Sequence, residues 1–381
     1  MIPETPNLQA HETINTMKSL NPAKPSNPAK PLNPTKPFDL ASFVRPHLLD
    51  MVPYSSARND FRGEAAVFLD ANENPFPTPY NRYPDPDHRA LREAWAAIRG
   101  VEADQILVGN GSDEILDMIY RTFCRPGQDT VLTISPSYGV YKVLAALNDL
   151  ALEEVPLDGN GQFDPETLLE AAERARLIQL CSPNNPTGNL LDRESVRKVL
   201  ERFDGPVVID EAYVDFSGDP GWIGELASYG QLIVIQTMSK AFGMAGIRVG
   251  AAFASREVID VLRKVKPPYN VSGLSQTAAL ERLHEPEIVA AEVGQIVEER
   301  RRLADMLSAH NAVKEIFPSD ANFLLIRVEN ARALKQFLED HGVIVRLRSF
   351  KPHFEECLRI TVGTKAENDT FLTVLDAFGA Q

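Results

Sequence analysis

The segment LIVIQTMSKAFGMAGIRVG, at Leu232–Gly250, joins an apolar strand to a Ser239-Lys240 pair and then, through small residues, to Arg248 and a second strand. A lysine at a strand end among small and apolar residues is partly desolvated. Desolvation lowers the pKa of the amine and makes it a nucleophile toward an aldehyde. Ser239 and Arg248 are both suited to hydrogen-bond one phosphate. An ordinary surface-loop lysine is the alternative, and this segment alone leaves both interpretations open.

Similar apolar runs recur on the N-terminal side, with helical patterns at Glu114–Phe123 and Asp192–Phe203 between them. Continuous apolar strands separated by helices are typical of a parallel sheet covered on both faces. Ligands bind such sheets at the carboxyl ends of the strands. The sequence therefore predicts an α/β protein whose large domain has a mostly parallel central sheet with helices on both faces. The predicted strands are Ile106–Val108, Thr130–Ile134, Leu177–Leu180, Val207–Ile209 and Leu232–Ile235.

The last third of the chain predicts a smaller C-terminal α/β domain. A long helix at about 285–310 precedes strands at 322–328, 343–347 and 358–362 and a terminal helix. We expect a disordered Pro/Lys-rich tail at 1–42, an N-terminal arm joining the small domain at 43–75, a large cofactor-binding domain at 76–270 and the small domain at 271–381. The tail carries prolines at every third position from Pro22 to Pro37, which favours polyproline II. It is either a solvated spacer or a ligand for an aromatic-lined groove.

Composition excludes several classes of function. The net charge is −14, from 39 basic and 53 acidic residues, which disfavours nucleic acids and anionic membranes as partners. The three cysteines, Cys124, Cys181 and Cys357, are far apart, and no C-x-x-C or H-E-x-x-H spacing occurs, so neither a disulfide framework nor a metal site is expected. No apolar span and no secretory signal is evident. We expect a soluble, reduced, cytoplasmic protein.

Two further strand ends carry polar side chains. Asp210 directly follows Val207–Ile209 and is a candidate to pair with a buried cationic ring nitrogen, which turns the ring into an electron sink. Tyr213 is suited to hydrogen-bond a phenolic oxygen of the same ring. A helix cap is the alternative for Asp210. In CSPNNPTG, at Cys181–Gly188, two prolines and a glycine fix an irregular turn that presents an asparagine amide, and we expect a cis proline there.

A phosphate site is indicated by VGNGSDE at Val108–Glu114, a strand and a glycine turn before a helix that opens at Asp113. Free N–H groups at a helix N-terminus bind phosphate, and Ser112 adds a hydroxyl. Asp113 as a simple N-cap is the alternative. Tyr138 follows the Thr130–Ile134 strand, where its ring is suited to stack on a flat cofactor.

The C-terminal domain carries two groups of basic residues. Arg359 lies within the apolar run LRITVG, where a buried guanidinium is costly unless it meets an anion such as a carboxylate. Arg346 and Arg348, with Lys351 and His353, form a second cluster, for which an ordinary charged loop is the alternative. Whether Arg348 or Lys351 reaches the pocket stays open at this point.

Together these motifs resemble the fold-type-I pyridoxal-phosphate aminotransferases of class I/II, and the chain is particularly similar to histidinol-phosphate aminotransferases. The resemblance extends from about Tyr54 to the C-terminus and includes DANENP at Asp70–Pro75 and NRYP at Asn81–Pro84, along with CSPNNPTG, DEAY, SKAF and LRITVGT. The segment 347–356 matches no pattern of the family. The resemblance implies pyridoxal 5'-phosphate as cofactor and a homodimer as the active unit.

Carried over by position, the resemblance makes Lys240, Asp210 and Tyr213 catalytic. Lys240 carries the cofactor and moves the proton, and Asp210 pairs with the ring nitrogen. The cofactor-binding residues it implies are Ser112, Asp113, Tyr138, Asn185, Asp210, Tyr213, Ser239, Lys240, Arg248 and, from the neighbouring subunit, Tyr83. The substrate-binding residues it implies are Arg359 for an α-carboxylate, and Arg346 with Tyr54 and Asn72 nearby for the side-chain or phosphate end.

The implied activity is a ping-pong transamination. Histidinol phosphate and 2-oxoglutarate give imidazole-acetol phosphate and glutamate. An aromatic amino-acid transaminase and a threonine-phosphate decarboxylase are the alternatives on the same scaffold. A cofactor-sensing domain of a transcription regulator is a third, but the proline-rich tail supplies no helix-turn-helix.

Overall fold

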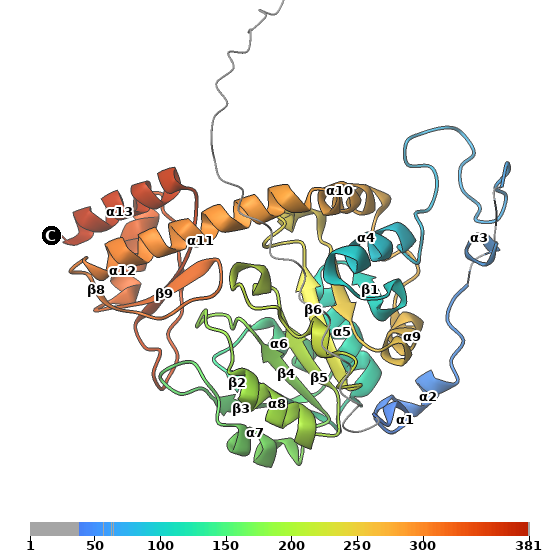
Figure 1. Ribbon diagram of the computed structural model, residues 1–381, viewed down its shortest axis with the longest axis horizontal. Helices are drawn as coiled ribbons and strands as arrows, with labels where there is room; N and C mark the ends of the chain where they lie inside the picture. The colour runs from blue at the N-terminus through green and yellow to red at the C-terminus, as the bar shows by residue number, and fades with distance from the viewer. Residues whose placement is uncertain (1–37, 56, 62, 64, 380–381) are drawn as a thin grey trace, which may run out of the picture.

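The computed structural model describes residues 38–55, 57–61, 63 and 65–379 and contains two sheets (Figure 1). The larger sheet has seven strands in the order β1-β7-β6-β5-β4-β2-β3. All run parallel except β7, which is antiparallel to both of its neighbours, so the predicted mostly parallel sheet is confirmed. The strands are β1 Ile106–Gly109, β2 Thr130–Ser135, β3 Ala151–Pro156, β4 Leu177–Cys181, β5 Val207–Asp210, β6 Leu232–Thr237 and β7 Gly250–Phe253.

Helices cover both faces of this sheet because its strands are apolar on both sides. Within β1, Leu107 packs into one core and Val108 into the other. One face carries α4 Arg89–Arg99, α7 Pro165–Ala172 and α8 Arg193–Arg202; the other carries α5 Ser112–Phe123, α6 Val140–Leu147 and α9 Arg256–Val265. The prediction missed β3, an edge strand whose Glu153 and Glu154 break the apolar run.

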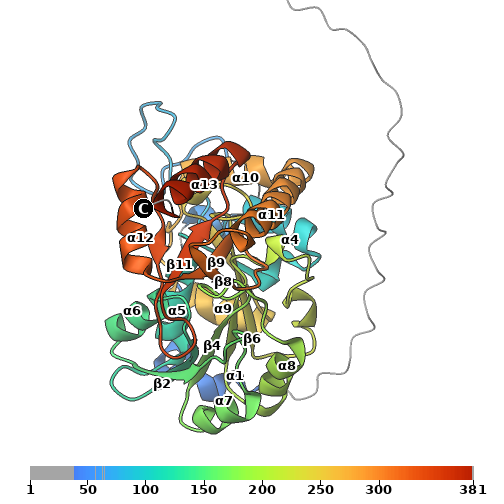
Figure 2. The ribbon, with the colours of Figure 1, turned by 90° about the vertical axis from the view of Figure 1, so that its left-hand side faces the viewer.

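The smaller sheet is antiparallel, in the order β10-β11-β9-β8, and Figure 2 brings it to the front. Its strands are β8 Val313–Ile316, β9 Phe323–Val328, β10 Arg346–Leu347 and β11 Cys357–Thr361. The helices α11 Pro286–Ser308, α12 Ala331–Asp340 and α13 Lys365–Gly379 cover one face. Phe323, Leu325 and Cys357, on the other face, join the core of the large domain. The strand expected at 343–347 is only the two residues of β10.

The N-terminal segment begins on the large domain rather than on the small one. Val44 and Leu48, around the short helices α1 Leu40–Phe43 and α2 Pro46–Leu49, are buried against α5 and α9. The chain then runs through α3 Ala57–Asp60 along the outside of the large domain, at the right of Figure 1. The proline-lysine repeats lie outside the described residues.

The proposed domain limit near residue 270 falls just before α10 Gly273–Leu283, which packs against α4 of the larger domain. All three cysteines are free and buried. Within the part of the chain that the structure describes, no helix has the length and apolar character needed to cross a bilayer. The same residues contain no group of three His, Cys, Asp or Glu side chains suited to hold a metal.

Candidate active site

One pocket gathers most of the predicted side chains where β4, β5 and β6 end. Asp210 is the last residue of β5, and Lys240 and Asn185 follow β6 and β4 by a few residues. The N-terminus of α5 and one edge of the small sheet complete the walls. The lining residues are Ser112, Asp113, Tyr138, Cys181, Asn185, Asp210, Ala212, Tyr213, Thr237, Ser239, Lys240, Arg248, Arg348 and Arg359.

Asp210 is a buried carboxylate with two hydrogen bonds. The Tyr141 hydroxyl donates to Oδ2 at 2.8 Å, and the Ala212 backbone N–H donates to Oδ1 at 3.1 Å. Burial raises the pKa of Asp210 to about 6, against the effect of these two donors. A carboxylate so enclosed pairs strongly with a cation that enters the pocket.

Lys240 has the lowered pKa expected of a desolvated amine. Burial is the main cause, and the charge of Arg359 adds to it, whereas Asp210 acts in the opposite direction. Its Nζ lies 5.6 Å from the centre of the Tyr213 ring. A lowered pKa leaves more of the amine unprotonated near neutral pH, which both a nucleophile and a proton acceptor require.

The predicted phosphate cradle gathers Ser112, Ser239 and Arg248 near the start of α5, with the Asp113 carboxylate beside them. Gly111 has φ +80°, and a Cβ there would lie 2.6 Å from the Arg248 guanidinium, so the close approach requires glycine. Arg248 donates to the Ser239 Oγ at 3.3 Å and lies 3.7 Å from Asp113. The helix begins at Ser112 with Gly111 as its cap, so the alternative role of Asp113 as N-cap is wrong. Hydroxyls, a guanidinium and a helix N-terminus suit a phosphate.

The irregular turn after β4 presents Asn185 to the pocket. The Ser182–Pro183 and Asn185–Pro186 bonds are both cis, as expected for this turn. Asn185 donates from Nδ2 to the Tyr213 hydroxyl at 3.4 Å and accepts from Arg359 at Oδ1. Tyr138 lies between this turn and the cradle, and burial raises the pKa of its hydroxyl to about 12. The residues therefore fit pyridoxal phosphate: donors for its phosphate, a lysine for its aldehyde and a buried carboxylate for its ring nitrogen.

Three arginines share the face of the small sheet that looks toward the large domain. Arg346 pairs directly with Arg359 in the antiparallel register, and the Arg348 N–H continues the ladder by donating to the Cys357 carbonyl at 2.9 Å. Side chains alternate along a strand, so Arg346, Arg348 and Arg359 point to one face, and Leu347 and Leu358 point to the other. Leu358 is indeed buried in the core of the small domain.

Two of these arginines, Arg348 and Arg359, line the pocket, whereas Arg346 is exposed. Burial is the main cause that lowers the pKa of both Arg348 and Arg359, and the neighbouring positive charge of Arg346 adds to it. The Nε of Arg359 is buried without a hydrogen-bond partner among the described residues. Half-buried guanidinium groups that repel one another and retain a free donor are suited to bind an anion.

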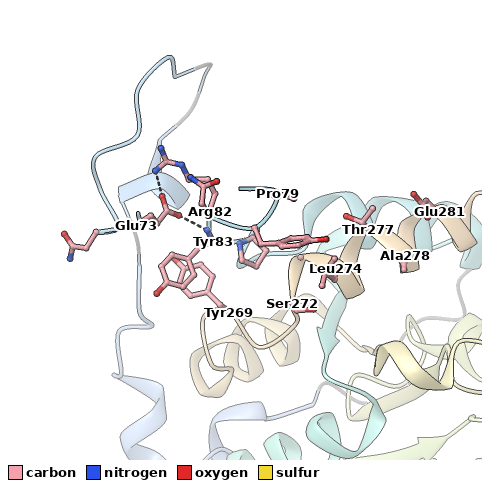
Figure 3. A pocket seen from close by; sticks show the side chains of 15 residues that line it. Glu73, Pro79, Arg82, Tyr83, Tyr269, Ser272, Leu274, Thr277, Ala278 and Glu281 are labelled. Carbon is pink, nitrogen blue, oxygen red and sulfur yellow. Dashed lines mark hydrogen bonds and ion pairs between the residues drawn. The ribbon is translucent and has the colours of Figure 1, made fainter. Parts of the chain in front are cut away.

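The remaining predicted residues lie elsewhere. Asn72 and Tyr83 line a separate groove beside α10, where the Tyr83 ring stacks on Tyr269 at 4.4 Å (Figure 3). Tyr54 is 68% exposed. The expectation that Tyr54 and Asn72 lie near Arg346 is wrong within one chain, because the segment that carries them extends along the opposite side of the large domain from the small sheet (Figure 1).

Sequence reasoning missed Tyr141 and left Arg348 undecided. Tyr141 occupies a buried position of α6, in VYKVLAAL, where an apolar helical pattern gives no sign of a polar contact. Arg348 could have been found from its spacing. It lies two residues after Arg346, which belongs to a predicted strand, so an extended chain points both side chains to the same face. Cys181, Ala212 and Thr237 also line the pocket and were not predicted.

Comparison with known proteins agrees with this geometry. The sequence model of the aminotransferase class I and II family matches residues 59–375. The chain is 50% identical to a histidinol-phosphate aminotransferase of Parabacteroides distasonis, over 88% of this chain and 98% of the relative. It is 48% identical to one from Christiangramia forsetii, over 87% and 95% respectively.

Solved structures of histidinol-phosphate aminotransferases also share this fold. The histidinol-phosphate aminotransferase of Clostridium acetobutylicum superposes with a TM-score of 0.73 at 27% identity, covering 78% of this chain and 91% of that one. The Sinorhizobium meliloti enzyme, solved in complex with pyridoxal-5'-phosphate, superposes with a TM-score of 0.72 at 26% identity, covering 81% and 90%. The chain therefore belongs to the class I and II aminotransferases and, within them, to the family of the histidinol-phosphate aminotransferases.

Proposed function

We propose that the protein is a pyridoxal-phosphate-dependent transaminase that converts histidinol phosphate and 2-oxoglutarate to imidazole-acetol phosphate and glutamate. The observation that carries the proposal is a single pocket in which Lys240 and Asp210, at the strand ends of the large sheet, meet Arg348 and Arg359 of the small sheet. Membership of the family of histidinol-phosphate aminotransferases supports the choice of substrates.

The chain's own residues have separate tasks. When bound, the cofactor withdraws electrons from the carbon that bears the amino group. Lys240 would attach the cofactor, and its amine of lowered pKa would take the proton from that carbon and deliver it to the cofactor carbon to which the lysine was attached. Asp210, as a carboxylate, keeps the ring nitrogen protonated. Hydrogen bonds from Ser112, Ser239 and Arg248 hold the phosphate and so fix the orientation of the ring.

The arginine face accommodates two different anions in turn. The keto acid 2-oxoglutarate has an α-carboxylate, which a guanidinium binds bidentately, and Arg359 is the more enclosed candidate for that role. Histidinol phosphate has no α-carboxylate but carries a phosphate at one end. Arg348, which reaches the pocket, and the exposed Arg346 beside it supply the positive charge for that phosphate.

The test is a panel of amines added to the holoenzyme without an acceptor, followed through the visible absorbance of the cofactor. Histidinol phosphate is expected to react rapidly, and phenylalanine and tyrosine much more slowly. The Arg348→Ala variant is expected to lose about 30-fold in kcat/KM for histidinol phosphate, roughly 2 kcal/mol. Its rate with phenylalanine should stay nearly unchanged, because that substrate carries no phosphate.

The matched control is Lys351→Ala, an exposed cation on the same segment that does not line the pocket. A preference for aromatic amino acids that survives Arg348→Ala would contradict the proposal and indicate an aromatic transaminase. Release of carbon dioxide from threonine phosphate would indicate a decarboxylase instead.

We also propose that the active unit is a homodimer in which Tyr83 serves the cofactor phosphate of the neighbouring subunit. Two observations support this: Tyr83 lies outside the pocket of its own chain, and the segment around it exposes many apolar side chains. These are Val52, Tyr54, Phe61, Val67, Phe68, Leu69, Phe76, Tyr80 and Tyr83. A concentration of exposed apolar side chains in one segment is typical of a protein interface.

Light scattering is expected to give about twice the chain's 42.2 kDa. Inactive Tyr83→Ala and Lys240→Ala chains, refolded together, should regain activity, since each mixed dimer keeps one site with both residues intact. Each variant refolded alone is the control. A monomeric mass, or no recovery on mixing, would contradict the shared site.

A further inference from the structure

Tyr141 makes a hydrogen bond to the one acidic group on which the proposed chemistry depends. It lies on α6, a helix that supplies no other hydrogen bond to Asp210 among the described residues. Its side chain is 1% exposed, and its hydroxyl donates to Asp210 Oδ2 at 2.8 Å. Because the Ala212 N–H donates to Oδ1 at 3.1 Å, both carboxylate oxygens are held, from two different directions.

The surroundings of Tyr141 fix its hydroxyl in place. The Tyr138 ring packs edge-on against the Tyr141 ring, with 5.6 Å between centroids. The Cys181 thiol lies beside the hydroxyl, at the end of the strand next to β5. Burial raises the pKa of Tyr141 far above its ordinary value, so the hydroxyl keeps its proton near neutral pH and remains a donor to the carboxylate.

A buried carboxylate needs such a donor in order to remain ionised. Burial raises the pKa of Asp210 to about 6, and hydrogen bonds to the charged form lower it. Lys240 also favours the charged form, whereas Asp113 disfavours it. The other titratable groups that face Asp210 are Tyr120, Tyr138, Cys181 and Tyr213.

We propose that Tyr141 is a positioning residue, whose hydroxyl keeps Asp210 ionised and aimed at the ring nitrogen of the cofactor. The proposal rests on the proposed function for the identity of that ring. Without the hydroxyl, the carboxylate becomes more basic and competes with the ring nitrogen for one proton. A neutral ring beside a neutral carboxyl group withdraws electrons less well, and the reaction slows although no substrate contact has changed.

The first experiment uses the cofactor-free protein and so does not depend on activity. Tyr141→Phe removes only an oxygen atom, and the folded-state pKa of Asp210 is expected to rise by about one unit. When folding raises the pKa of a carboxyl group, ionisation of that group destabilises the folded state. The stability is therefore highest below the unfolded pKa and is lost as the pH rises through the folded pKa. Tyr141→Phe should therefore lose little stability at about pH 5 and more at about pH 8.

The Asp210→Asn background separates this role from simple packing. There, the effect of Tyr141→Phe on unfolding should be the same at both pH values, because no carboxylate remains to titrate. Tyr120→Phe is the matched control: Tyr120 is also fully buried, but its hydroxyl has no hydrogen-bond partner among the described residues. A pH-independent loss that persists in Asp210→Asn would overturn the proposal.

The second experiment uses the holoenzyme with a cofactor labelled with nitrogen-15 in the ring. The wild type and Tyr120→Phe should show a protonated ring nitrogen at about pH 8, and Tyr141→Phe a larger unprotonated fraction. The kcat of Tyr141→Phe should fall about tenfold at unchanged KM. An unchanged nitrogen spectrum would overturn the role of the hydroxyl. Failure to bind the cofactor at all would refute the proposed function, while the measurements on the cofactor-free protein would still test the link to Asp210.

Discussion

Lys240→Ala is expected to lower kcat for transamination by about 10⁴-fold. Lys240 is the one amine among the described residues that line the pocket, so the change removes both the attachment point for the cofactor and the group that moves the proton. Burial and the positive charge of Arg359 hold the pKa of Lys240 down, and water is a much weaker base than an unprotonated amine. Single-turnover absorbance measurements with histidinol phosphate test this directly.

Mass spectrometry provides a second measurement for the same variant. Borohydride reduction of the wild type should leave the cofactor permanently on the peptide that contains Lys240, whereas the variant should carry none. Lys142→Ala is the control, because Lys142 is an exposed lysine on α6 beside the site. If Lys240→Ala kept kcat within about tenfold of the wild type, the assignment of the base would be wrong.

Arg359→Ala is expected to lower kcat/KM for 2-oxoglutarate by about 10³-fold, or roughly 4 kcal/mol. The loss is large because the guanidinium is enclosed and also donates to Asn185, so its removal leaves both the substrate carboxylate and the amide without a donor. Arg359→Lys keeps the charge but loses the planar pair of donors, and an intermediate effect is expected. Steady-state kinetics with varied 2-oxoglutarate measures both.

Arg332→Ala is the matched control, since Arg332 is an exposed arginine on α12 of the same domain. The reaction with histidinol phosphate should suffer less than that with 2-oxoglutarate, because the donor lacks an α-carboxylate. Equal losses for the two substrates would indicate that Arg359 acts only by supporting the Asn185 turn.

The strand ends of the large sheet were predictable because strands buried on both faces are continuous apolar runs, and a polar residue directly after such a run stands out. Asp210 and Lys240 were found in this way, and the structure places both in one pocket. The edge strand β3 was not predicted, because its glutamates, Glu153 and Glu154, interrupt the apolar run. The contact of Tyr141 with Asp210 was not predictable, because it lies on an apolar helix face. The pattern of such a face is the same whether or not one of its hydroxyls binds a carboxylate.

A resemblance to a family assigns a role to each matching residue. It does not say whether that residue serves the pocket of its own chain or the pocket of a neighbouring subunit. Tyr54, Asn72 and Tyr83 matched the motifs of the family, yet none of them lines the pocket that holds Lys240. The resemblance assigned Arg346 to the substrate and left Arg348 open, whereas Arg348 lines the pocket and Arg346 is exposed, although both occupy the same face of the strand. How deep each one lies depends on where the two-residue strand β10 ends and on how the small sheet rests on the large domain.

The cofactor site and the substrate-binding arginines belong to different sheets, and this separation has an evolutionary consequence. Every pocket residue that contacts the cofactor in the proposal comes from the large domain, and the arginines proposed to select the substrate come from the small sheet. Selection can therefore alter the strand and loop around Arg348 while the electron-withdrawing machinery stays intact. Such an arrangement makes new substrate preferences reachable through a few substitutions around Arg348, because none of these changes removes a residue that is proposed to hold the cofactor.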